Sequence, residues 1–178
     1  MIPKELEALL DERDGYVEGA LHVRGRAAEP AWHSLEEVWK GEHALHRLYR
    51  HVKPTDVPFA QDCLGDQFLL RDGAVHRLEA ETGDIEQLAD DLGAFLAMAA
   101  EDPQAILGSD WIEVLEKRGG KLEPGQSIHV YPPFVAKESE DGVTLNPIDT
   151  LELLRWHADF ARQIEDVADG ESIEIEFD

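Results

Sequence analysis

The sequence contains a single cysteine, Cys63, among its 178 residues. An internal disulfide is therefore excluded, which fits a protein kept in a reducing compartment. The sequence also lacks any run of about 18 apolar residues, so no membrane-spanning helix is expected. Residues 1–15 read as a short charged helix without the apolar core and cleavage site of a signal peptide. Together these absences predict a cytoplasmic protein.

Basic residues are scarce: the chain has 16 Lys and Arg against 39 Asp and Glu, a net charge of −23. A field this negative repels nucleic-acid phosphates and anionic lipid, so binding to nucleic acid or to a membrane surface is not expected. Two interpretations of the charge remain open. It can serve solubility alone, or it can steer the chain toward a basic protein partner.

The common catalytic motifs are also missing. The sequence has no Gly-x-Ser-x-Gly elbow, no phosphate-binding Gly-x-x-x-x-Gly-Lys loop, no dinucleotide fingerprint and no His-Glu-x-x-His pair. We therefore expect neither an enzyme nor a bound cofactor or metal.

The pattern of apolar residues predicts one α+β domain over residues 1–178, with a mainly antiparallel mixed sheet surrounded by helices. Ser34 and Glu37 fit a capping box at the start of a helix, and Asp72-Gly73 is a two-residue hairpin signal between two strands. Asp84 fits the N-cap of a helix that carries Ile85 to Ala99, and Asn146-Pro147 fits the start of the longest helix. The remaining predicted elements are a helix at 4–13, strands at 19–25, 57–60, 67–71, 74–80 and 128–131, two short helices between 102 and 119, and a final strand at 172–177.

The stretch from Val57 to Ile85 resembles the SUKH superfamily, which includes yeast cell-wall-synthesis regulators and many bacterial immunity proteins. The matching residues are Pro58-Phe59-Ala60, Asp62, Gly65-Asp66-Gln67-Phe68, Asp72-Gly73, Val75 and Glu81-Thr82-Gly83, followed by the helix from Ile85. The resemblance is specific over 57–98 and looser over 19–170. It implies a mainly antiparallel sheet with helices around it, and a protein that binds and neutralises a toxin's catalytic domain. The family has no common catalytic residues, so the resemblance implies none here.

Acidic residues around the central turns are the first candidates for a functional site. Asp62 and Asp66 flank Gly65 and could act as an acid–base pair or hold a cation, but Asp more often caps backbone N–H groups in tight turns. Glu79, Glu81, Asp84 and Glu86 could collect calcium, yet their spacing does not fit a calcium loop. A solvated acidic rim is the favoured interpretation.

Histidines, the cysteine and one tryptophan are the other candidates. His43 and His46 are three residues apart on a predicted helix, with Glu42 and His51 nearby, and could share a metal; surface or half-buried histidines are favoured. Cys63 could be a nucleophile beside His22 or His76, but a small buried side chain is favoured. Trp32 lies in a predicted loop and is a candidate contact for a partner, although a place in the core is favoured.

Two classes of function therefore remain. The first is a non-catalytic protein-binding module, expected to be an immunity protein that occludes the active site of a basic toxin domain such as a nuclease, or else a regulatory scaffold. The second and weaker one is a small metal-dependent hydrolase using His43 and His46 or Glu79 and Glu81. Whether the chain is a monomer or a homodimer stays open. The candidate protein-binding residues are Asp62, Asp66, Glu79, Glu81, Asp84 and Trp32.

Overall fold

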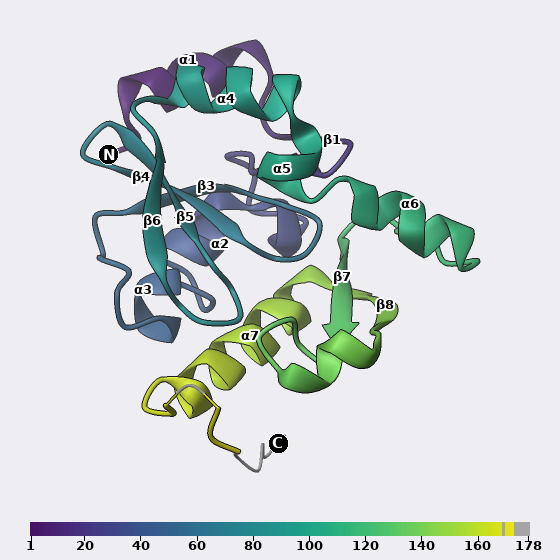
Figure 1. Ribbon diagram of the computed structural model, residues 1–178. Coiled ribbons are helices and arrows are strands. Elements are labelled where there is room, and N and C mark those ends of the chain that lie inside the picture. The colour runs from purple at the N-terminus through teal and green to yellow at the C-terminus, as the bar shows by residue number, and fades with distance from the viewer. Residues whose placement is uncertain (169, 173–178) are drawn as a thin grey trace.

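A computed structural model describes residues 1–168 and 170–172. It is an α+β structure, and within these residues it has seven α-helices, a six-stranded sheet and a two-stranded sheet (Figure 1). The helices are α1 (Lys4–Glu12), α2 (Leu35–Trp39), α3 (Leu45–Leu48), α4 (Leu92–Glu101), α5 (Pro103–Leu107), α6 (Asp110–Lys117) and α7 (Thr150–Ile164). The strands are β1 (Tyr16–Glu18), β2 (Leu21–Val23), β3 (Val57–Gln61), β4 (Gln67–Arg71), β5 (Ala74–Leu78), β6 (Ile85–Ala89), β7 (Gln126–Tyr131) and β8 (Thr144–Asp149). None of the described helices is long and apolar enough to cross a membrane.

The large sheet is antiparallel throughout, and its strands follow the chain in the order β1 to β6. The Asp72-Gly73 hairpin is confirmed: Arg71 pairs with Ala74, and both turn residues have positive φ, 53° and 88°. A two-residue turn of this kind requires positive φ at both positions because its twist then matches that of the strands.

The predicted helix from Asp84 was wrong in its first part. Ile85 to Ala89 form strand β6, which pairs with β5, and the helix begins only at Leu92. Asp91, not Asp84, caps that helix by accepting a hydrogen bond from the N–H of Ala94 at 2.7 Å. Pairing with β5 satisfies the backbone groups on one side of 85–89, so the tertiary partner overrides the helical spacing of their side chains.

The predicted start of the longest helix was also wrong. Asn146 and Pro147 lie in strand β8, opposite His129 and Ile128 of β7. The helix begins at Thr150, where the Asp149 carboxylate accepts hydrogen bonds from the N–H groups of Leu151 and Glu152. Proline is tolerated in this short two-stranded sheet because a strand edge does not need its N–H.

Some of the other predicted elements are confirmed and others are not. The first helix is present as Lys4–Glu12, but the predicted helix from Ser34 is split into α2 and α3 around Gly41. Ser34 occupies the N-cap of α2 without a side-chain hydrogen bond, so the capping box is not formed. The predicted final strand at 172–177 lies almost wholly outside the described residues.

Both faces of the large sheet are buried. Phe68 on β4 packs with Phe59 and Phe95 on the face that α1 and α4 cover, with ring centroids 4.7 Å and 5.6 Å from that of Phe95. Leu69, its neighbour on β4, points to the opposite face and belongs to a second cluster with residues of α3 and α7. Because successive side chains of a strand alternate between faces, β4 forms the centre of both cores. Figure 1 shows the corresponding layers, with α1 and α4 on one side of the sheet and α3 and α7 on the other.

A buried arginine lies where the β7–β8 hairpin meets the large sheet. Arg24 is 1% exposed, and its guanidinium donates to the carbonyl of Pro58 at 2.9 Å and to the side-chain oxygens of Gln61 and Gln67 at 2.6 and 2.7 Å. Burial lowers the pKa of Arg24 to about 9. The Gln61 amide in turn donates to the hydroxyl of Ser127 on β7, which extends this polar network into the hairpin.

Candidate functional site

The β3–β4 turn is built around the carboxylate of Asp62. Its Oδ1 accepts hydrogen bonds from the N–H groups of Leu64, Gly65 and Asp66 at 2.9, 2.9 and 3.1 Å, and Asp62 is 4% exposed. Gly65 has φ 103°, a conformation that an L side chain rarely adopts. The turn interpretation of Asp62 is confirmed, and its carboxylate is not available at the surface to a partner.

Asp66 joins this turn to the β5–β6 turn. Its Oδ1 accepts a hydrogen bond from the N–H of Ala80 at 2.9 Å. Burial raises the pKa of Asp66, and the charges of Glu79 and Glu86 raise it further. Burial also raises the pKa of Asp62, with a further contribution from the charge of Asp66. The predicted acidic residues are therefore gathered at one end of the sheet.

We call residues 79–84 the acidic turn. Glu79 and Asp84 are exposed, whereas Glu81 is half-buried. The N–H of Glu79 donates to the carbonyl of Asp84 at 2.9 Å, which closes the turn. Two of the three predicted acidic contacts in this turn thus have free access to solvent, and the third has a structural partner.

That partner is residues 131–135, which we call the apolar loop. The two carboxylate oxygens of Glu81 accept hydrogen bonds from the N–H groups of Phe134 and Val135, each at 3.0 Å. Burial raises the pKa of Glu81, and these two N–H donors oppose the increase. Tyr131, Phe134 and Val135 are 49%, 40% and 50% exposed, a high value for large apolar side chains. Phe134 keeps one ring contact, with Trp111 at 5.0 Å between centroids.

A groove of about 1180 Å³ runs beside the acidic turn and the apolar loop. Its walls come from α3 and the residues after it, the acidic turn, the apolar loop with the 3-10 helix η2 (Lys137–Asp141), and α7 with the residues that follow it. Tyr131 and Val135 line it together with Asp84, so the groove and the exposed apolar side chains are continuous. The basic residues of the walls are Arg47, Arg50, Lys137 and Arg162.

Trp32, the last of the predicted contact residues, does not lie beside the groove. It is half-buried in the short 3-10 helix Ala31–His33, with its ring 5.2 Å from the rings of both His22 and His33. A Cβ on Gly125 would lie 2.8 Å from its Nε1, so the backbone of Gly125 lies directly against the indole. Trp32 is not among the described residues that line the groove.

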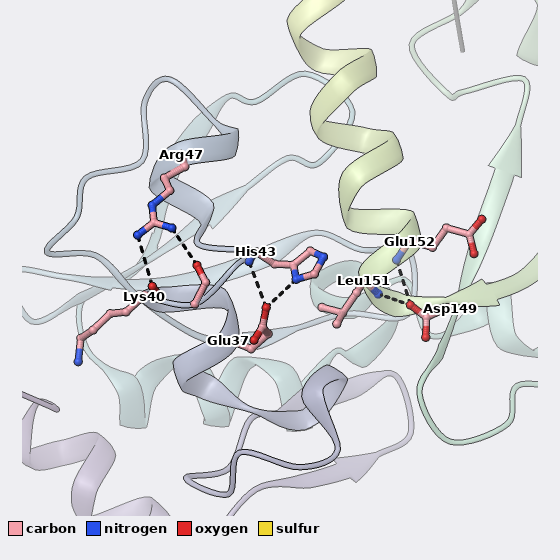
Figure 2. Close-up of polar contacts among 8 residues, drawn as sticks. Glu37, Lys40, His43, Arg47, Asp149, Leu151 and Glu152 are labelled. Atoms are coloured by element: carbon pink, nitrogen blue, oxygen red, sulfur yellow. Dashed lines mark hydrogen bonds and ion pairs between the residues drawn. The ribbon is translucent and has the colours of Figure 1, made fainter. Parts of the chain in front are cut away.

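The predicted pairing of His43 with His46 is not found, because His43 precedes α3 and faces the end of α2. Its Nδ1 lies 2.7 Å from Oε1 of Glu37, and its backbone N–H donates to the same oxygen at 3.2 Å (Figure 2). The hydrogen bond from His43 is the main cause that lowers the pKa of Glu37. Glu37, Glu42 and His43 place one ligand atom each within 4.8 Å of one another.

Cys63 is buried, and its thiol lies 3.7 Å and 3.6 Å from the carbonyl oxygens of Leu107 and Gly108. Burial raises the pKa of the thiol, and the charge of Asp62 raises it further. A nucleophilic cysteine needs a lowered pKa, so the interpretation of Cys63 as a small buried side chain is the one that fits.

Family models, curated proteins and solved structures contain no match to this chain. The resemblance to the SUKH superfamily therefore stays a prediction.

Sequence reasoning found the acidic turn but missed the apolar loop. Pro132 to Val135 were not among the contact residues predicted from the sequence. The sequence signal for an exposed loop was a short apolar run that follows two prolines and precedes the charged segment Lys137–Asp141.

Proposed function

We propose that this chain is a non-catalytic protein-binding module that presents the acidic turn and the apolar loop to a basic protein. Following the SUKH resemblance, we propose that it is an immunity protein and that the partner is a bacterial toxin domain, such as a nuclease. The observation that carries the proposal is the exposure of Phe134 and Val135 on a loop held directly by the Glu81 carboxylate of the acidic turn.

This combination suits a protein interface. Binding energy at interfaces is concentrated in a few large apolar and aromatic side chains, surrounded by polar groups that exclude water. Tyr131, Phe134 and Val135 are large and exposed, and Glu79 and Asp84 lie on the neighbouring turn. The apolar side chains would supply most of the affinity, and the carboxylates would choose a partner of positive charge.

The acidic residues divide into two roles in this proposal. Glu81 positions the apolar loop, because both of its oxygens already accept backbone hydrogen bonds. Glu79 and Asp84 contact the partner directly. The net charge of −23 accelerates encounter with a basic surface, so association should slow markedly as salt rises. Inhibition follows from occlusion, since a protein seated over a basic substrate groove excludes the substrate.

The test is affinity capture at low salt from cells of the native host, followed by mass spectrometry. The double variant Phe134→Ser, Val135→Ser is compared with the wild type and with Val17→Ser, a control that alters an equally exposed side chain on β1. We expect one dominant basic protein that the wild type and the control retain, that the double variant loses, and that salt releases.

Equal capture by all three proteins would contradict the proposed surface. A dominant partner that is neither toxic nor encoded beside this chain would replace the immunity proposal with the regulatory scaffold. Toxicity is measured directly, by expressing the captured protein with and without this chain.

A further inference from the structure

We propose that Glu37, Glu42 and His43 form a binding site for a divalent first-row transition-metal ion, with zinc the best fit to one nitrogen and two oxygen donors. The three ligand atoms lie within 4.8 Å of one another. This site lies on the turn between α2 and α3, apart from the acidic turn and the apolar loop.

The backbone brings the three side chains together by reversing sharply at Gly41. Glu37 lies in the middle of α2, and Glu42 and His43 follow the reversal. A Cβ on Gly41 would lie 2.9 Å from Oε2 of Glu37 and 2.7 Å from its carbonyl oxygen, so a side chain there would displace the carboxylate. The guanidinium of Arg47 fixes the reversal by donating to the carbonyls of Gly41 and Lys40 at 3.2 and 3.4 Å (Figure 2).

His43 is the residue that distinguishes this group from an ordinary acidic cluster. It is 8% exposed, its Nδ1 faces the Glu37 carboxylate, and its buried Nε2 has no hydrogen-bond partner among the described residues. A buried imidazole usually uses both of its nitrogens. Among the described residues, the ring makes its one polar contact on the side where the carboxylates converge, so the surrounding packing holds Nδ1 toward them.

The distances require little movement to accept an ion. Zinc binds nitrogen and carboxylate oxygen at about 2.0–2.2 Å, so two ligands of a tetrahedral site lie about 3.4 Å apart. His43 Nδ1 and Glu37 Oε1 are at 2.7 Å and need to separate by less than an ångström, to a position on either side of the ion. The Glu42 side chain is exposed and can rotate to close the third position.

The ion would replace a proton. A carboxylate only accepts hydrogen bonds, so Nδ1 of His43 carries the proton in its contact with Glu37. Binding through Nδ1 moves that proton to Nε2, because a neutral imidazole carries one proton and binds a metal through its other nitrogen. Three protein ligands leave one position of a tetrahedral zinc ion for water or for a side chain of a bound protein.

The experiment titrates zinc chloride into the metal-free full chain by calorimetry, in two buffers that differ in their heat of ionisation. We expect one zinc ion per chain, bound at a single site in both buffers. Glu42→Gln, which alters an exposed side chain, is expected to weaken binding at least about tenfold while leaving the melting temperature of the metal-free protein unchanged.

Glu116→Gln is the matched control, because it removes one exposed carboxylate from α6, outside the site. A chain with 39 acidic residues binds cations weakly at many places, and such binding would be equal in both variants. The proposal is overturned if zinc binds only weakly and at several sites, or if Glu42→Gln and Glu116→Gln bind it as the wild type does.

Discussion

The buried histidines should make the protein less stable as the pH falls below 6.5, and His157 on α7 offers the cleanest test. It is 4% exposed, and burial, with a smaller contribution from the charge of His129, lowers its pKa from 6.5 to about 3. Burial also lowers the pKa of His22 from 6.5 to about 2, aided by the charges of Arg24 and His33. Both side chains are therefore neutral in the folded protein at any pH above these values.

The size of the effect follows from the difference in proton binding between the two states. In the unfolded chain each histidine takes up a proton near pH 6.5, whereas in the folded chain it does not. The free energy of unfolding is therefore highest above pH 6.5 and decreases as the pH falls toward 3. One pKa unit corresponds to about 1.4 kcal/mol, so at about pH 5 each histidine destabilises the fold by about 2 kcal/mol. His22 and His157 together contribute about 4 kcal/mol.

Urea unfolding, followed by the fluorescence of the four tryptophans, measures this effect at about pH 7.5 and about pH 5. The carboxyl groups of Asp62, Asp66 and Glu81 act in the opposite direction, because their raised pKa lets the folded state bind protons first. The comparison is therefore made between the wild type and His157→Gln, whose amide does not titrate.

We expect His157→Gln to lose about 2 kcal/mol less stability than the wild type between the two pH values, whatever its stability at neutral pH. His51→Gln, at an exposed position, is the control and should follow the wild type. If His157→Gln keeps the full pH dependence of the wild type, His157 is not held neutral in the folded state and the reasoning fails.

Three further predictions concern single contacts. Glu81→Gln should remove one of the two hydrogen bonds to the apolar loop, because an amide NH2 cannot accept one, at a cost of about 1 kcal/mol; hydrogen exchange at Phe134 and Val135 should then speed up while exchange in β4 stays unchanged. Arg24→Met should destabilise the protein by about 3 kcal/mol in urea unfolding, because the side-chain oxygens of its buried partners lose their charged donor; wild-type stability would show that the guanidinium adds nothing net. Phe95→Ala should cost about 3–5 kcal/mol by the same assay, since it opens a cavity against two aromatic rings; a loss below about 1 kcal/mol would mean that the core closes over the gap.

The parts of the fold that could be predicted are those with a local cause. Asp72-Gly73 dictates a hairpin because the turn conformation depends on these two residues alone. Asp62 was likewise expected to cap its own turn, and it does. Ile85 to Ala89 were missed because β5, which is outside that segment, decides their conformation.

The same distinction between local and distant causes applies to the candidate site. The acidic turn is visible as a run of charges, but the exposure of Phe134 and Val135 depends on what the rest of the chain leaves uncovered. Glu37 shows the limit most clearly, since its spacing from Ser34 predicted a capping box. The carboxylate instead faces His43, because the reversal at Gly41 brings that residue within reach.

The order of the strands bears on how the protein folds during synthesis. Each strand from β1 to β6 pairs with its neighbour in the chain, so the whole sheet can assemble once residue 89 has left the ribosome. Leu69 and Leu78 then face outward on the side that Leu154 and Ala158 of α7 later cover. Until about 65 more residues are made, the nascent chain carries a formed sheet with one incompletely covered apolar face. That intermediate is the species on which chaperones should act.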